Sequence, residues 1–141
     1  MKLELKHLAG YLPYGLKMSR NNFEGELIAI KNDKESIAET FEFQVSCSNW
    51  WENNIDENHY KPILRPLSDL TKEIEVNGEK FVPIEKVDYI TTLIHVSNYP
   101  FDFLDLQHIP HHSFEQLQEW HFDIHGLITE GLAIDINTLY K

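Results

Sequence analysis

The most strongly constrained stretch of the sequence is residues 60–85, in which two prolines, a helical pattern and a turn signal follow one another. Pro62 and Pro66 hold their own backbone extended, and each ring keeps the preceding residue out of the helical region. A strand over residues 60–64 is therefore expected. Basic and acidic residues balance over residues 58–86, with five of each, so this part of the chain is suited to join two halves of a fold.

A short helix and a hairpin are predicted directly after Pro66. Ser68 offers an N-cap oxygen, and the apolar spacing of three and four residues that follows predicts an amphipathic helix over residues 68–74. Asn77-Gly78 lies between apolar, strand-forming residues, which is the strongest short-range signal for a two-residue hairpin turn. The centre of the chain is thus expected to hold a short helix followed by a hairpin.

The first half of the chain predicts a small, mainly antiparallel sheet. A helix is expected over residues 3–9, ended by a glycine and a proline, and strands are expected over residues 16–18 and 24–31. The clearest strand pattern covers residues 37–45, where apolar and polar residues alternate as in a half-buried antiparallel strand. The side chains expected on its buried face are Phe41, Phe43 and Val45.

The last quarter of the chain predicts one long amphipathic helix over residues 114–130. Ser113 and Gln116 have the spacing of a capping box, and Gly131 suits a C-terminal cap. A short final strand is expected at residues 132–136. The helical face expected to pack on the sheet consists of Leu117, Trp120, Ile124 and Ile128.

These elements predict an α+β fold in a single domain over residues 1–141: a small, mainly antiparallel sheet packed by a C-terminal amphipathic helix, with a short central helix and hairpin. A chain of 141 residues can bury a core without disulfides or metals. Residues 87–96 suit either a strand or a helix, and irregular or short helical structure is expected from there to Pro110.

The compartment is indicated by what the sequence lacks. Cys47 is the single cysteine, so no internal disulfide can form, and a reducing cytoplasm is expected. A lone cysteine in strand-rich sequence is more often a small buried hydrophobe than a nucleophile. No apolar run is long enough to span a bilayer, and the N-terminus lacks the apolar core and cleavage pattern of a signal peptide. No membrane association is therefore expected.

Acidic residues outnumber basic ones by 23 to 12, which gives a formal net charge of −11. The charge is uneven: residues 1–23 carry +3, residues 24–57 carry −7 and residues 87–141 carry −7. Residues 87–140 contain no Lys or Arg, which argues against direct nucleic-acid binding there, because phosphate contacts require cations. The acidic surface suits either simple solvation or a basic partner.

Residues 49–58 have the composition of a polar, acidic loop, yet they contain two adjacent tryptophans. Tryptophan is enriched at the hot spots of protein interfaces. The tryptophans and the nearby acids therefore predict a partner-binding site, formed by Trp50, Trp51, Glu52, Asp56 and Glu57. The alternative is one core ring and one partly covered ring at the end of a strand.

No motif for catalysis or cofactor binding is present: the sequence has no Gly-rich phosphate loop, CxxC, GxSxG or HExxH. We therefore expect no enzymatic activity, no catalytic residue and no cofactor. Histidine is the one candidate for metal chemistry, because His121 and His125 are four residues apart on the predicted helix, and His111 or His112 could add a third ligand. His121 also falls on the apolar stripe, where a hydrogen-bonded core histidine is the commoner outcome, so no metal site is predicted.

Three segments of the chain form a recognisable set: MKLELKHLAGYLPYGLK at residues 1–17, KPILRPLSDLTKEIEVNGEKFVPIE at residues 61–85, and EWHFDIHGLITEGLAIDINTL at residues 119–139. Together they resemble a family of short, uncharacterised proteins encoded in bacteriophage and prophage genomes. The resemblance implies a phage or mobile-element origin and a bacterial cytoplasm, and it supplies no activity. In that family the position of His125 often holds an apolar aromatic residue, which argues against a metal ligand there.

Three functions are consistent with these observations, in decreasing order of support. The first is a non-enzymatic protein that binds and modulates a host protein. Its best-motivated target is a basic nucleic-acid-handling machine such as an RNA-guided defence nuclease, as for an anti-CRISPR inhibitor. The second is a self-associating accessory or structural phage protein. The third is a small metal-binding protein or metal-dependent enzyme built on His121, His125 and the His111–His112 pair.

Overall fold

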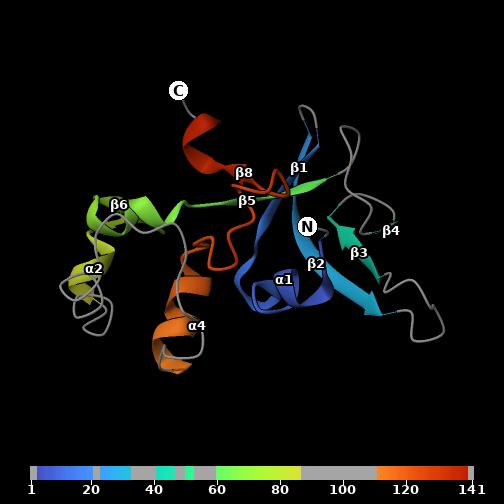
Figure 1. The fold of residues 1–141 in the computed structure, drawn as a ribbon, viewed down its shortest axis with the longest axis horizontal. Coiled ribbons are helices and arrows are strands. Elements are labelled where there is room, and N and C mark those ends of the chain that lie inside the picture. The colour runs from blue at the N-terminus through green and yellow to red at the C-terminus, as the bar shows by residue number, and fades with distance from the viewer. Residues whose placement is uncertain are drawn as a thin grey trace.

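The computed structural model describes residues 3–20, 23–32, 41–46, 50–52, 60–86 and 111–139. The fold is α+β with a mainly antiparallel sheet, as predicted. Within the described residues the larger sheet has six strands in the order β4-β3-β2-β1-β5-β8 (Figure 1). Neighbouring strands are antiparallel except β5 and β8, which are parallel. The strands are β1 (Lys17–Arg20), β2 (Phe23–Asn32), β3 (Phe41–Val45), β4 (Trp50–Glu52), β5 (Lys61–Leu64) and β8 (Ile134–Asp135).

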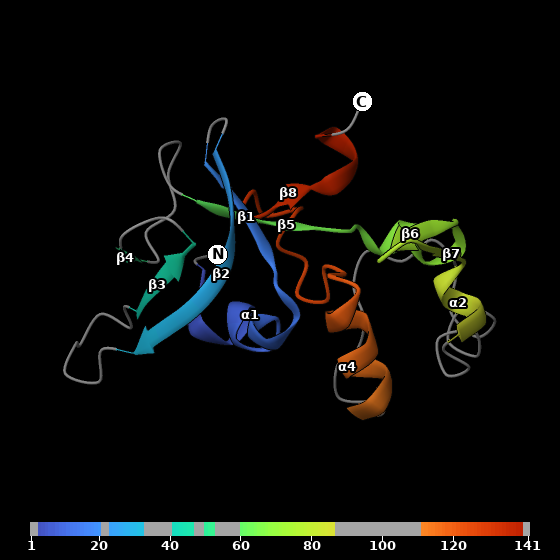
Figure 2. The same ribbon diagram turned by 180° about the vertical axis from the view of Figure 1, so that it is seen from behind.

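Short helices and a hairpin lie beside this sheet. Helix α1 (Leu5–Ala9) lies against β2, and α4 (His111–Glu119) approaches the end of α1 closely enough for Gln118 to contact Gly10. The hairpin of β6 (Ile74–Val76) and β7 (Glu79–Phe81), followed by α2 (Pro83–Lys86), lies at the opposite end of the molecule from β3 and β4 (Figure 2). The described 3-10 helices are η1 (Leu12–Tyr14), η2 (Leu67–Thr71) and η3 (Ile136–Thr138).

A core cluster of apolar side chains connects the sheet to the helices. Strand β3 shows the predicted alternation, with every second side chain buried. Burying a large apolar side chain stabilises a fold by about 1.5–3 kcal/mol. Members of the cluster come from α1, β2, β3, β5 and α4, and include Leu8, Leu27, Phe41, Phe43, Val45, Leu64 and Leu117.

The predicted hairpin is confirmed. Asn77 and Gly78 have φ angles of 52° and 83°, the pair of positive values that a type I′ turn requires. Ile74 pairs with Phe81 across the two strands, and the turn twists them in the sense that a β-hairpin prefers.

The predicted central helix is present, but its type and bounds differ from the prediction. It is the 3-10 helix η2, Leu67–Thr71, and Pro66 rather than Ser68 holds the N-cap position, with φ −68° and ψ 149°. Ile74 does not extend the helix because it begins β6, where it pairs with Phe81. The hairpin therefore begins where the apolar spacing suggested a further helical turn.

The predicted helix over residues 114–130 is wrong in length. Helix α4 ends at Glu119, and His121 has a left-handed φ of 61° that no α-helix accommodates. The carboxylate of Asp123 accepts the backbone N–H groups of Leu127 at 2.8 Å and of Ile128 at 2.9 Å, so a side chain replaces helical carbonyls as acceptor.

The apolar stripe of that prediction is nevertheless largely buried. Leu117, Trp120 and Ile124 belong to the core cluster, and Ile128 packs against it. Ser113 is a buried residue inside α4 rather than its cap, and the side-chain amide of Gln116 donates to Glu119 at 3.1 Å. The apolar side chains at helical spacing are therefore largely buried as expected, although the backbone after Glu119 is not α-helical.

The final strand is shorter than predicted because Asp135 ends it. The Asp135 carboxylate accepts the backbone N–H of Asn137 at 2.9 Å and starts η3, so Ile136 leaves β8. The predictions for Cys47 and for residues 87–110 lie outside the described residues, as does the 37–40 part of the third strand. No helix in the described part of the chain is both long and apolar enough to cross a membrane.

Gly25 permits the close approach of β2 and β3. A Cβ atom added at Gly25 would lie 2.5 Å from Cγ1 of Val45 and 3.0 Å from the carbonyl oxygen of Ser46. Both distances are shorter than van der Waals contact, and Val45 is fully buried, so its side chain has little room to move. Glycine at this position therefore sets the spacing between the two strands.

Gly25→Ala is expected to lower the free energy of unfolding by about 1–3 kcal/mol, because the added methyl group overpacks β2 against β3. Urea unfolding followed by circular dichroism measures this loss. In Gly25→Ala/Val45→Ala the clashing Cγ1 atom is gone, so the double variant should lose less than the sum of the single losses. Strictly additive losses would contradict the contact.

Candidate partner-binding face

Trp50 and Trp51 lie in strand β4, not in the loop that the composition of residues 49–58 predicts. Trp50 is opposite Gln44 and Trp51 is opposite Phe43 in the antiparallel pairing with β3. Aromatic residues favour a pleated, half-buried position, and here β3 supplies the partner strand. Because successive side chains of a strand point to opposite faces, the two indoles are separated by the sheet.

Trp51 is the covered ring of the pair, as the alternative interpretation supposed for one of them. It packs edge-on against Tyr60, with ring centroids 5.4 Å apart. The guanidinium carbon of Arg20 lies 4.8 Å from the centre of the Trp51 ring, on the same side of the sheet. Trp51 thus belongs to the packing of the fold, at the margin of the core cluster.

Trp50 faces the other side and is 43% exposed. Ala29, Gln44 and Trp50 form one row across β2, β3 and β4. A register shift between Leu27 and Ala29 marks a bulge at Ile28, and Ile28 is 51% exposed. We call these four side chains, Ile28, Ala29, Gln44 and Trp50, the outer patch.

The charged groups around the outer patch are mixed within the described residues. Glu24 and Glu26 are exposed on β2, and Glu26 is opposite Lys17 of β1. Glu42 forms a loose ion pair with Lys31, at 3.9 Å between Nζ and Oε2. The stronger acidity belongs to the connecting sequence, since residues 24–57 as a whole carry −7.

The structure therefore brings together only part of the predicted site. Trp50 and Trp51 are adjacent in sequence but lie on opposite faces. Glu52 lies in β4 opposite Glu42, while Asp56 and Glu57 lie outside the described residues. Sequence reasoning did not identify Ile28, because an apolar residue within the apolar centre of a predicted strand gives no sign that its side chain is exposed.

The histidines do not share one helical face, which removes the basis on which His121 and His125 were a candidate ligand pair. His121 Nε2 lies 2.7 Å from the carbonyl oxygen of Tyr14, and because a carbonyl only accepts, Nε2 carries the hydrogen. The ring of His125 instead packs against His7, with centroids 5.1 Å apart. His111 lies on α4, 2.8 Å from Glu115. Among the described residues, no group of three His, Cys, Asp or Glu side chains is placed to hold a metal ion.

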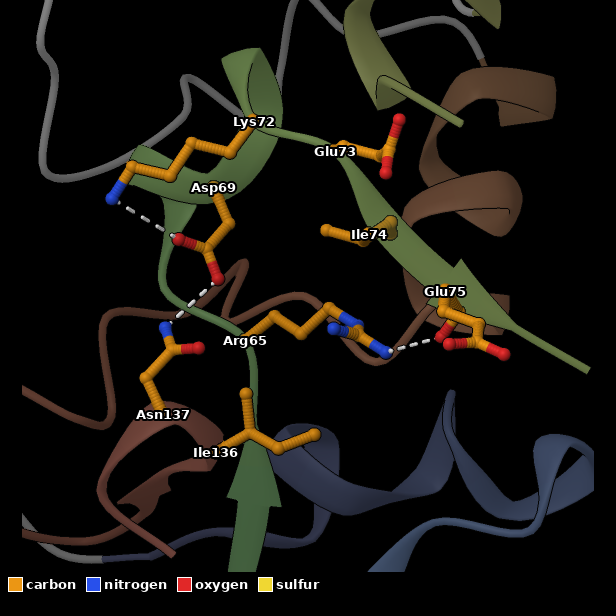
Figure 3. Close-up of a pocket in the computed structure, with 8 residues that line it drawn as sticks. All are labelled: Arg65, Asp69, Lys72, Glu73, Ile74, Glu75, Ile136 and Asn137. Atoms are coloured by element: carbon orange, nitrogen blue, oxygen red, sulfur yellow. Dashed lines mark hydrogen bonds and ion pairs between the residues drawn. The ribbon is translucent and has the colours of Figure 1, made fainter. Parts of the chain in front are cut away.

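A cavity of about 540 Å³ lies beside Arg65 and is lined by residues of η2, β6 and η3 (Figure 3). The Arg65 side chain extends toward Glu75, where Nη2 donates to the backbone carbonyl at 3.2 Å. Its Nε donates to the carbonyl of Trp120 at 3.1 Å. Desolvation lowers the pKa of Arg65, and the nearby Asp69 carboxylate opposes that shift.

The second charged group of this cavity, Asp69, also has partners within the fold. Asp69 is only 4% exposed, and its carboxylate accepts a hydrogen bond from the side-chain amide of Asn137 at 2.9 Å. The Lys72 ammonium lies 3.6 Å from its other oxygen. Arg65 and Asp69 therefore hold the cavity wall together, and neither is presented as an activated nucleophile or base.

Comparison with known proteins finds no match to this chain among protein-family models, curated proteins or solved structures.

Arg65→Lys is expected to lower the free energy of unfolding by about 1–3 kcal/mol, because one ammonium cannot bond both carbonyls in the geometry of the guanidinium fork. Urea unfolding measures this change. Lys72→Met is the control, since it removes an exposed charge from the same cavity and should change stability by about 0.5 kcal/mol or less. A loss of about 0.5 kcal/mol or less in Arg65→Lys would show that a positive charge alone is sufficient at this position, and would contradict the role of the guanidinium fork.

Trp51→Ala is expected to lower the free energy of unfolding by about 1–3 kcal/mol, through lost packing on Tyr60 and Arg20. Trp50→Ala should change it by about 0.5 kcal/mol or less, because its indole faces outward. Thermal and urea unfolding of the two variants side by side measure the contrast. A larger loss of stability for Trp50→Ala than for Trp51→Ala would show that Trp50, not Trp51, stabilises the fold.

Proposed function

We propose that this chain is a non-enzymatic binding protein whose outer patch docks on a basic surface of a host protein. The observation that carries the proposal is the position of Trp50, which is 43% exposed on β4 beside the outward-facing row of β2 and β3. Trp51 packs inward, so the fold is held without the neighbouring Trp50 indole.

An exposed tryptophan suits an interface anchor for two physical reasons. Its large ring buries much apolar area while losing few rotatable bonds, and its N–H can still find a hydrogen-bond partner. Ile28 adds a second exposed apolar side chain on β2, on the other side of β3 from Trp50, at 51% exposure. Apolar side chains grouped in this way, within a polar surround, are typical of a binding surface.

The charge of the chain supports a basic partner. The net charge is −11, and residues 24–57, which contain the outer patch, carry −7 of it. An acidic surface attracts a basic one during encounter and disfavours nucleic acid and other acidic surfaces. A nucleic-acid-handling protein, such as an RNA-guided defence nuclease, presents basic surfaces of this kind, which makes an inhibitor of such a machine our favoured role.

The resemblance to short phage and prophage proteins supports the same assignment. It suggests a bacterial host, and with it a cytoplasmic site of action. The role does not require catalysis, since carboxylates and an anchor residue are sufficient to occupy or flank a channel built for phosphates.

Trp50→Ala is expected to abolish or weaken partner capture by at least about tenfold, the loss of one strong hot-spot residue. The measurement is a tagged pulldown from bacterial host lysate at low and at high salt, followed by affinity measurement with the purified protein that is recovered. Phe23→Ala is the matched control, because Phe23 is also exposed, at 64%, but lies at the far end of β2. Capture by wild-type chain should weaken at high salt, because screening shortens the range of charge attraction.

Three outcomes would contradict the proposal. An equal loss of capture in Trp50→Ala and Phe23→Ala would indicate non-specific adsorption through exposed apolar side chains. Unchanged capture in Trp50→Ala would show that Trp50 is not an anchor of the interface. Recovery of the bait alone, with a larger mass in sizing chromatography that Trp50→Ala reduces, would assign the same patch to self-association.

A further inference from the structure

The N-terminal segment, residues 3–14, is docked on residues 120–128 through polar groups that lie far apart in the sequence. The Tyr11 hydroxyl donates to the carbonyl of Phe122. His121 Nε2 donates to the carbonyl of Tyr14 at 2.7 Å. At the other end of this contact the His7 ring packs against His125, with centroids 5.1 Å apart.

His7 also forms part of the N-terminal cap of α1. The backbone N–H of Glu4, the N-cap residue, donates to Nδ1 of His7 at 2.9 Å. This is the place that glutamate or glutamine holds in a capping box. A neutral imidazole has one N–H, so Nδ1 accepts this bond only while His7 is neutral and carries its hydrogen on Nε2.

Protonation of His7 therefore breaks the cap directly. The added proton goes to Nδ1, which then faces the N–H of Glu4 as a second donor. The His7 ring is only 1% exposed, so a charge formed there has little access to water. Of the charged groups near it, the Glu4 carboxylate lies 3.7 Å from Nε2 and favours the charge, while Lys6, 3.2 Å from the same carboxylate, opposes it.

His125 reinforces the same response from the other side of the contact. Its Nε2 is buried and meets no hydrogen-bond partner among the described residues. A charge on His125 would lie against the ring of His7, and Lys6 adds further repulsion. The two rings thus cannot both be charged while they remain packed together.

We propose that His7 and His125 form an acid-operated latch: protonation of these rings opens the cap of α1 and releases the N-terminal segment from residues 120–128.

The direction and range of the pH response follow from burial. Desolvation, more than any neighbouring charge, lowers the pKa of His7, and it lowers the pKa of His125 to about 4. In the released segment the rings are in water, and each then has the ordinary histidine pKa of 6.5. A group whose pKa is lower in the latched state stabilises that state fully above about pH 6.5, and the stabilisation is lost as the pH falls toward 4.

His121 adds to this response without being its trigger. Burial lowers its pKa as well, and among its neighbours Arg65 and Lys17 disfavour its charge while Glu26 favours it. Its bond to Tyr14 uses the hydrogen on Nε2, and protonation adds a proton at Nδ1 instead, so protonation of His121 does not itself remove that bond. The cap at His7 is the contact that a proton removes.

The test is amide hydrogen exchange of the full chain at about pH 7 and about pH 5, corrected for intrinsic rates. For His125 alone, the change in pKa from 6.5 to about 4 raises the released fraction roughly 20-fold between these two pH values. Amides of α1 should lose protection by at least about that factor in wild-type chain, because His7 adds to the effect of His125, while amides of β3 keep theirs. An equal loss in β3 would show that acid unfolds the whole chain, and would overturn the latch.

The matched variant is His7→Gln/His125→Phe, in which glutamine keeps an acceptor for the Glu4 N–H and phenylalanine keeps a ring at the contact. Protection of its α1 amides should change clearly less than in wild type over the same range, because neither replacement titrates and only the contribution of His121 remains. His111→Gln is the control, since its ring is 83% exposed and lies on α4, and it should behave as wild type. Loss of protection in the double variant equal to that of wild type would overturn the proposal.

A second measurement needs no variant. The amide signal of Glu4, followed by NMR from about pH 7 to about pH 4, should shift with the same midpoint as the His7 ring, because the amide loses its acceptor as the ring gains its proton. A Glu4 signal that stays constant while His7 titrates would separate the ring from the cap and overturn the latch.

Discussion

The hydrogen bonds of Arg65 are the constraint on which the arrangement of the other elements depends. Its backbone N–H donates to the carbonyl of His121, and its own carbonyl accepts from the N–H of Asp123, each at 2.8 Å. Its guanidinium bonds the carbonyls of Trp120 and Glu75. One residue thus fixes the end of β5 to the hairpin and to the segment after α4. Because both acceptors are backbone atoms, the planar fork of arginine positions these elements in a way that a single ammonium cannot.

The opposite end of the sheet is built on a different principle, cross-strand packing without buried charge. Phe43 and Trp51 lie side by side on the inner face of β3 and β4, whereas Gln44 and Trp50 lie on the outer face. The inner pair stabilises the sheet, whereas the outer indole leaves apolar surface exposed to solvent. Packing against Tyr60 and Arg20 explains Trp51, and a binding role is what we propose for Trp50. The two adjacent tryptophans therefore differ in their surroundings, although they are neighbours in sequence.

Local signals in the sequence were sufficient where a residue and its neighbours decide the structure. The alternation at Phe41, Phe43 and Val45 predicted β3, and Asn77-Gly78 predicted the hairpin, because both depend on backbone geometry within a few residues. The long C-terminal helix failed because apolar spacing specifies burial, while the Asp123 carboxylate specifies the backbone by capturing two N–H groups.

Contacts between distant segments could not be predicted in this way. The pairing of β4 with β3 turned an apparent loop into a strand, and it placed Trp50 and Trp51 of the predicted site on opposite faces. His7 and His125 are 118 positions apart in the chain, so no local sequence pattern could predict that their rings are in contact. Their burial, and hence their pKa, is a property of the docked segment alone.

Strand β2 connects the two proposals, because its two faces are used differently. Leu27 lies in the core cluster with Leu8 of α1, the helix that the histidines hold in place, while Ile28, one residue later, faces outward with Trp50. In the two proposals, a proton acts through the helix on the inner side of β2, and a partner binds the outer side. A partner that binds only the latched form stabilises that form in proportion to its own affinity, by linkage. Bound chain should then hold its N-terminal segment to lower pH than free chain, although no residue of the latch belongs to the outer patch.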